Sequence, residues 1–150
     1  MADAVRFLAR GDRSAGQVER HLTTRGYPAK MVRTALRTLC RFGYVNDEAV
    51  ALRLAKARLA RRLMGREALA AELKAREFPA ETIARVVGEA FEGTTEQAVA
   101  ESFLMSLPPR YTDPARESRR RVGLLRGRGF SADVIETVLA SQVHDENVQR

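Results

Sequence analysis

One short pattern occurs three times in this chain of 150 residues, and it constrains the fold more than any other feature. Each copy is a predicted helix that ends in Leu-x-x-Arg, followed by a turn with an aromatic residue and by a Pro or Ser that begins the next helix. The aromatic residues are Tyr27, Phe78 and Phe130, which lie 51 and 52 residues apart. A near-constant period is typical of tandem structural repeats. We therefore predict three repeats, over residues 1–45, 46–93 and 94–150.

The composition and the helix-start signals predict that every repeat is helical. Ala, Leu, Arg and Glu dominate, whereas the β-branched and aromatic residues that strands favour are sparse. Ser14 with Gln17, and Thr94 with Gln97, have the spacing of a capping box at a helix start. We therefore predict an all-α fold of three tandem three-helix repeats, forming an elongated, curved array.

The third repeat departs from the other two in its loop and at its end. Prolines interrupt residues 106–114 and forbid a continuous helix there, so this repeat has a longer, Pro-rich internal loop. Asp113 followed by Pro114 then marks the start of the next helix. From about Val143 the chain is polar, and we expect this C-terminal tail to fray.

The repeated turn is predicted to be a structural joint. Gly26 and Gly129 stand where a residue with a left-handed backbone closes a helix, and Glu77 replaces glycine in the second copy. A glutamate there must either adopt the left-handed conformation or force a different cap. We expect the turn aromatics to pack inward. The arginines before the turns are interpreted as structural residues that cap helix ends and cover these aromatics: Arg25, Arg76 and Arg128.

The sequence offers no recognisable site for catalysis, a cofactor or a metal. No nucleophile is paired with a base, no glycine-rich phosphate loop occurs, and the single cysteine, Cys40, has no companion for a disulfide or a metal. Cys40 follows Leu39 in a predicted helix, so we expect a small buried hydrophobe. No apolar run approaches the roughly 20 residues of a membrane helix, and no signal peptide is recognisable. We expect a non-enzymatic, monomeric cytoplasmic protein without a cofactor or a membrane partner.

The net charge of +7 is concentrated in the first repeat. Residues 1–45 hold nine basic and three acidic side chains, whereas the numbers are nearly balanced in residues 46–93 and 94–150. Four cations of the first repeat recur every three or four residues, on the helix face opposite Val32, Leu36 and Leu39. These four, the basic stripe, are Lys30, Arg33, Arg37 and Arg41. Such runs are usually solvated surface, but no acid interrupts this one, and an anionic partner would relieve its repulsion.

Two further basic clusters are candidate binding residues. One ends the fourth predicted helix, where the helix dipole favours cations, so part of it has a structural explanation. Its members are Lys56, Arg58, Arg61 and Arg62. The other lies in the third repeat and wraps around its helix, which makes it a less focused site. Its members are Arg116, Arg119 and Arg120.

Four segments together resemble the RecX family of bacterial regulatory proteins. They are LARGDRS at Leu8–Ser14, RGY at Arg25–Tyr27, GYVNDEAVA at Gly43–Ala51, and the Leu-x-x-Arg-Gly-Phe of Leu125–Phe130. The third segment is the most specific, and the likeness extends from about Val5 to Leu139. Two positions depart from the family pattern: Val50 stands where the family often has an aromatic residue, and Glu77 replaces the usual turn glycine.

The resemblance implies a regulator of the RecA recombinase that is not itself an enzyme. Family members bind in the groove of the filament that RecA forms on single-stranded DNA, obstruct its growth or promote its loss, and so lower RecA ATPase, strand-exchange and coprotease activity. The resemblance supplies no catalytic residue, so the basic stripe is the first candidate contact surface, and the RecA filament the expected partner.

Two alternatives to the RecA regulator remain open. Single-stranded DNA is a further possible partner, and it is the partner expected in the first of them. One is a module that binds nucleic acid directly, although no Asn or Gln set stands beside the arginines to read bases, and the turn aromatics are assigned to structural positions rather than to a stacking platform. The other is a general helical interaction scaffold. Inhibition of RecA without binding of free DNA would distinguish the regulator from the nucleic-acid-binding module.

Overall fold

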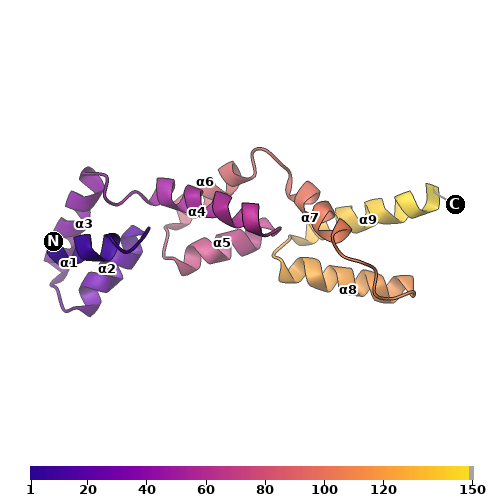
Figure 1. Ribbon diagram of the computed structural model, residues 1–150, viewed down its shortest axis with the longest axis horizontal. Helices are drawn as coiled ribbons and strands as arrows, with labels where there is room; N and C mark the ends of the chain where they lie inside the picture. The colour runs from indigo at the N-terminus through magenta and orange to yellow at the C-terminus, as the bar shows by residue number, and fades with distance from the viewer. Residues whose placement is uncertain (149–150) are drawn as a thin grey trace.

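The computed structural model describes residues 1–148, with side chains through Gln142. That part of the chain forms nine helices and no strand, which confirms the all-α prediction. The helices are α1 (Ala2–Leu8), α2 (Ala15–Thr24), α3 (Ala29–Arg41), α4 (Asp47–Arg61), α5 (Arg66–Ala75), α6 (Ala80–Ala90), α7 (Glu96–Met105), α8 (Pro114–Gly127) and α9 (Ala132–Val148). Successive groups of three helices follow one another in an elongated array, with α1 and α9 at opposite ends (Figure 1).

Three separate hydrophobic clusters lie along the array, one in each group of three helices. Their best-buried leucines are Leu39, Leu69 and Leu125, respectively. The turn aromatics pack against these clusters: Phe78 and Phe130 are buried, and Tyr27 is half-buried. Each repeat thus has a small core of its own, and the repeats depend on the contacts between them to form one array.

Local capping explains most of the helix boundaries. The Ser14 hydroxyl accepts a hydrogen bond from the Gln17 backbone N–H, and the Gln17 side chain accepts one from the Ser14 N–H, which completes the predicted capping box. The cap predicted at Thr94 is wrong by one residue, because Thr95 caps α7 through the Ala98 N–H. The fraying predicted from Val143 is also wrong, because the backbone of α9 is helical to Val148, and the last two residues of the expected tail lie outside the described residues.

The turn residues adopt the left-handed backbone that the pattern predicts. Gly26 has a φ of 83° and Gly129 a φ of 75°. Glu77 takes the same conformation, with a φ of 62°, and is the one residue other than glycine with a positive φ among residues 1–148. The glutamate therefore accepts the strained conformation and does not force another cap.

Each of the second and third turns also contacts the preceding repeat. The turn after α5 lies against the start of α2, where the Ser14 Oγ donates a hydrogen bond of 2.6 Å to the Arg76 carbonyl. Gly16 faces the carbonyl of Glu77, and a Cβ at Gly16 would lie 2.6 Å from that oxygen. The close approach of the two backbones therefore requires glycine at this position.

The turn after α8 makes the equivalent contact with the start of α5. The Gly65 N–H donates to the Arg128 carbonyl at 2.8 Å, and the Glu67 N–H donates to the Gly129 carbonyl at 3.2 Å. A Cβ at Gly65 would clash with the carbonyl of Gly129. The turns are therefore joints between repeats as well as within them, a role that the sequence pattern did not reveal.

A carboxylate at the start of the next repeat completes each junction. Asp47 accepts a hydrogen bond of 2.8 Å from the Ala15 N–H, and Glu96 accepts one of 2.9 Å from the Arg66 N–H. Ala15 and Arg66 are the first residues of α2 and α5, whose N–H groups have no partner within the helix. The negative side chains also face the positive end of the helix dipole.

Candidate interaction surface

The basic stripe occupies the exposed face of α3. Val32, Ala35 and Leu39 form the buried face of this helix, and the predicted core residue Leu36 is half-buried. All four cations of the stripe are exposed, and none has a carboxylate within salt-bridge distance among the residues whose side chains are described. Four positive charges therefore lie on one helix face without internal compensation.

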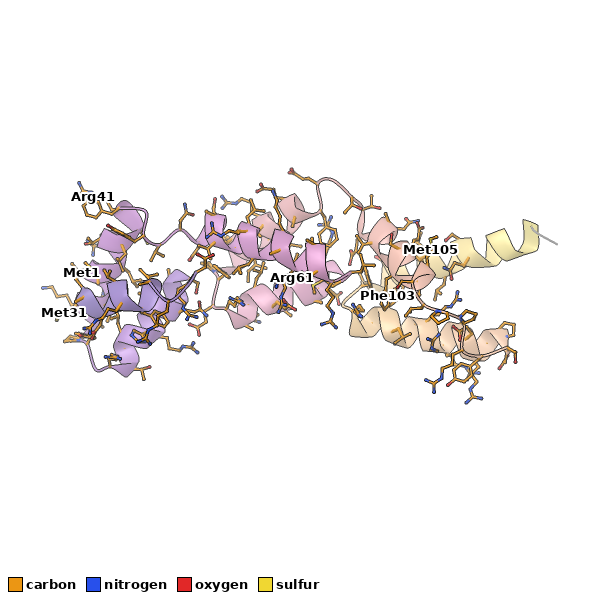
Figure 2. The ribbon with its side chains drawn as sticks, in the orientation of Figure 1. Met1, Met31, Arg41, Arg61, Phe103 and Met105 are labelled. Carbon is orange, nitrogen blue, oxygen red and sulfur yellow. The ribbon has the colours of Figure 1, made fainter. Side chains whose placement is uncertain are left out.

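Two exposed aromatic side chains extend the stripe at the end of α3. Phe42 is 67% exposed and Tyr44 is 65% exposed, in the turn that leads to α4. The Arg41 guanidinium lies over the Phe42 ring, 6.0 Å from its centroid, and Arg41 projects from the tip of the helix (Figure 2). The sequence reasoning missed these aromatics because it considered only the aromatics of the repeated turns, which it expected to be buried. One signal could have distinguished them: the Gly43-Tyr44 turn lacks the Pro or Ser that follows the aromatic residue in the three repeated turns.

Cys40 lies next to this surface and is exposed, so the prediction of a buried cysteine is wrong. It is on α3 one residue beyond the buried Leu39, and it points away from the core. Partial burial of the thiol, together with the carboxylate of Asp47, raises the pKa of Cys40. The thiol therefore stays protonated at neutral pH, which disfavours nucleophilic reactivity.

The structure divides the basic cluster at the end of α4. Arg58 is engaged within the protein, since its Nε donates to Glu72 at 2.6 Å. The other three members are exposed and have no carboxylate partner among the described side chains: Lys56, Arg61 and Arg62. This cluster therefore offers fewer free cations than the sequence suggested.

The cluster on α8 is partly used to hold the Pro-rich loop. Glu117 is buried and accepts hydrogen bonds from the backbone N–H groups of Arg110 and Tyr111, both at 3.2 Å, and from the Arg120 side chain at 2.6 Å. Burial opposes ionisation, but these hydrogen bonds, with one from Arg121, hold the pKa of Glu117 below its ordinary value. Arg120 is therefore a structural residue of this loop.

The two other candidates of this cluster remain exposed at the start of α8. The Arg116 guanidinium lies over the Tyr111 ring at 4.1 Å, and Arg119 donates only to the carbonyl of Ala115 in its own helix. The helices α3 and α8 belong to opposite end repeats of the array (Figure 1). The structure therefore does not bring this cluster together with the basic stripe.

A polar cluster fixes the first helix onto the first turn. The Tyr27 hydroxyl donates a hydrogen bond of 2.6 Å to Asp3, which also lies 2.7 Å from the Arg6 guanidinium and 3.6 Å from that of Arg25. The hydrogen bond from Tyr27, with these cations, lowers the pKa of Asp3, and the same bond raises the pKa of Tyr27. Arg25 thus pairs with Asp3 of α1, while its predicted roles of capping a helix end and covering the turn aromatic stay predictions.

The described residues hold no group of three or more His, Cys, Asp and Glu side chains suited to a metal ion. Nor does any helix among them have the length and apolar character needed to cross a bilayer. The chemistry that this molecule presents is a set of arginine-rich surfaces on a helical array.

Comparison with known proteins shows which family this array is similar to. The model of a family domain described as "RecX, first three-helix domain" matches residues 1–39. Proteins named "Regulatory protein RecX" from Mycobacterium bovis and Mycobacterium avium are each 29% identical to this chain, over 97% of its length and 87% and 86% of theirs. This chain is therefore similar to RecX proteins over nearly its whole length.

Solved RecX structures share the fold of this chain. The crystal structure of RecX from Lactobacillus salivarius aligns with a TM-score of 0.78 over 93% of this chain and 92% of that one, at 16% identity. A second RecX crystal structure aligns with the same TM-score over 93% of this chain and 70% of that one, at 18% identity. The arrangement of the helices is therefore that of RecX proteins.

Proposed function

We propose that this chain is a non-enzymatic regulator that binds the filament of RecA on single-stranded DNA in the cytoplasm and inhibits or disassembles it. Its binding would lower the ATPase, strand-exchange and coprotease activities of RecA. Similarity to mycobacterial proteins named "Regulatory protein RecX" over 97% of the chain supports a regulatory role. The resemblance of the sequence motifs supports RecA as the target.

One observation supports the contact surface: four exposed cations of α3 have no carboxylate partner among the described side chains. An array of repeats presents extended surfaces that can span neighbouring subunits of a filament. The stripe would meet either acidic protein surface or DNA phosphate there, and release of the like-charge repulsion on α3 would favour binding. After the stripe we place the exposed arginines of the third repeat, Arg116 and Arg119, and then Lys56, Arg61 and Arg62.

A second candidate function is direct binding of single-stranded nucleic acid. Phe42 and Tyr44 are exposed beside Arg41, and exposed aromatics next to cations are the elements with which proteins stack bases and track phosphates. The sequence argument against base stacking considered the turn aromatics Tyr27, Phe78 and Phe130, which are half-buried or buried. It did not consider the exposed Phe42 and Tyr44.

One experiment separates the two functions. RecA ATPase on single-stranded DNA is measured with increasing concentrations of the monomeric chain, while fluorescence anisotropy reports binding of the chain to labelled single-stranded DNA without RecA. Inhibition at concentrations where free DNA remains unbound supports the regulator. Tight binding of free DNA without any effect on RecA contradicts it and supports the second function.

A further inference from the structure

The three repeats differ at one equivalent position of their first helices. Each of these helices has a fully buried alanine, namely Ala4, Ala51 and Ala100, and α4 has a second one, Ala55. The turn arginines select the first of the two in α4, because Arg76 lines one cleft with Leu54, Arg25 lines one with Phe7, and Arg128 lies over Phe103. The residue three positions later lies on the same side of the helix, nearly one turn further along. The residues at this position are Phe7, Leu54 and Phe103. The two end repeats therefore have an aromatic ring where the middle repeat has an aliphatic side chain.

In the end repeats this ring is packed within the protein and covered by an arginine. Phe7 stacks on His21 of α2, with ring centroids 4.1 Å apart, and the Arg13 guanidinium lies 4.8 Å from the Phe7 centroid. Phe103 packs on the ring of Phe130 at 6.4 Å and lies beneath the guanidinium of Arg128 at 4.6 Å. An aromatic ring under a guanidinium thus occupies this place in both end repeats, and in the first repeat a smaller cleft of about 60 Å³ remains beside Phe7.

In the middle repeat the same place is an open cleft between α4 and α5. Its volume is about 170 Å³, comparable to the cavity of roughly 150 Å³ that binds benzene in an engineered protein. We call it the α4–α5 socket. Apolar residues form its floor, and charged side chains form its rim. The lining residues are Leu54, Ala57, Leu69, Leu73, Arg58, Arg61, Glu72 and Arg76.

The rim of the socket carries uncompensated positive charge. Glu72 is the single carboxylate of the rim and is paired with Arg58 at 2.6 Å. Arg61 is exposed, Arg76 is half-buried, and neither has a carboxylate within salt-bridge distance among the described side chains. Arg61 lies near the middle of the array (Figure 2). Because its side chain is exposed, a ligand could reach it.

We propose that the α4–α5 socket binds an aromatic side chain from an acidic segment of a partner protein. The partner's Phe or Tyr ring would occupy the place that Phe7 and Phe103 take in the end repeats, against Leu54 and Ala57, with the buried Leu69 and Leu73 beneath them. Neighbouring Asp or Glu side chains of the segment would pair with Arg61 and Arg76, whose guanidinium groups suit carboxylates. This proposal concerns the chemistry of the bound segment and does not rest on RecA being the partner.

The lining favours a protein segment over a nucleic acid. Proteins that bind single strands stack the bases on aromatic side chains, whereas the floor of the socket is aliphatic: Leu54, Leu69 and Leu73. The carboxylate of Glu72 at the rim would also repel a phosphate. An aromatic hydrocarbon ring would pack against the apolar floor, and flanking carboxylates would pair with Arg61 and Arg76.

The test uses a short fluorescein-labelled peptide with one phenylalanine between aspartates and glutamates, titrated with the full chain and followed by anisotropy. Leu54→Phe should fill the socket from within, as the end repeats do, and weaken binding at least tenfold. Arg61→Glu should weaken it by a similar factor. Arg126→Glu is a matched reversal of an exposed arginine outside both the socket and the basic stripe, and it should leave the affinity unchanged. Replacing the phenylalanine of the peptide with alanine should also abolish the signal.

Circular dichroism and thermal unfolding check that Leu54→Phe is folded; if it is not, Arg61→Glu and the alanine peptide decide the matter, because neither alters the core. The proposal is overturned if the wild-type chain does not bind the peptide at millimolar concentration, or if Arg61→Glu and Arg126→Glu bind it equally. It is also overturned if the socket variants lose binding of single-stranded oligothymidine while their affinity for the peptide does not change.

Discussion

The hydroxyl of Ser14 donates a 2.6 Å hydrogen bond to the backbone carbonyl of Arg76, 62 residues further along the chain. This bond joins the first repeat to the second, while the same oxygen accepts the capping hydrogen bond from the Gln17 N–H. Ser14 is fully buried, so no water replaces either partner. One side chain thus caps a helix and connects two repeats.

Ser14→Ala should therefore cost more than the loss of a cap alone. We expect the free energy of unfolding to fall by about 2 kcal/mol, from roughly 1 kcal/mol for the cap and a similar amount for the buried carbonyl left without its donor. Thr95→Ala is the matched control, because Thr95 caps α7 through the Ala98 N–H and makes no bond to another repeat. It should cost about 1 kcal/mol. Urea unfolding of both variants measures the difference, and equal losses would contradict the double role of Ser14.

The second junction can be tested with two glycines of the middle repeat. A methyl group at Gly65 would clash with the carbonyl of Gly129, so Gly65→Ala should lower the free energy of unfolding by about 1 to 3 kcal/mol. Gly88 lies inside α6 and faces open space, so Gly88→Ala should stabilise the protein by up to about 1 kcal/mol through helix propensity. Thermal unfolding compares the two, and a harmless Gly65→Ala would show that the repeats do not approach as closely as described.

The helices and turns could be predicted because their signals are local. The Leu-x-x-Arg pattern, the turn glycines and the capping box depend on residues a few positions apart, and they identified the all-α repeats. The junctions depend on residues between 30 and 63 positions apart, and no local pattern reports them. The start of α7 is an example. Because Thr95 is the cap, Glu96 is the first residue of α7, and its carboxylate accepts a hydrogen bond from the Arg66 N–H of the preceding repeat. The spacing to Gln97 alone favoured Thr94.

The exposure of the end of α3 also depends on how helices pack. In the middle repeat the first helix, α4, packs along the third helix, α6, whereas in the first repeat α1 packs mainly on α2. Cys40, Phe42 and Tyr44 are exposed at the end of α3. The basic stripe was predictable from helical spacing, whereas the exposure of these residues depends on which helices pack together, and no local pattern reports that.

The bond between Tyr27 and Asp3 should make stability depend on pH. The pKa of Asp3 is lowered in the folded protein, first by this bond. Its contribution is therefore present above the ordinary pKa of 3.8 and is lost as the pH falls through and below that value. Tyr27→Phe should lower the melting temperature at neutral pH, and the deficit should shrink in acid. Tyr44→Phe, at an exposed position, should have no effect at either pH, and a deficit for Tyr27→Phe that is the same at both would contradict the linkage.

Glu117 should hold the Pro-rich loop in the same pH-dependent manner. Its pKa is also lowered in the folded state, so its stabilising effect is complete above its ordinary value of 4.5 and is lost as the pH falls through the folded pKa. Glu117→Gln should speed hydrogen exchange at the N–H groups of Arg110 and Tyr111, which donate to this carboxylate. Glu101→Gln is the control, because Glu101 contacts only Gln97 of its own helix. Unchanged exchange in Glu117→Gln would mean that the loop is held by other contacts.

The most direct test of the central claim measures RecA ATPase on single-stranded DNA with a charge-reversed stripe. We predict that wild-type chain inhibits the ATPase and that Arg33→Glu with Arg37→Glu raises the concentration for half-inhibition at least tenfold, with unchanged helicity by circular dichroism. Lys74→Glu with Arg126→Glu reverses two exposed cations outside the stripe and should inhibit like the wild type. Equal inhibition by the stripe variant would place the contact elsewhere, and no inhibition by the wild-type chain would contradict the proposed function itself.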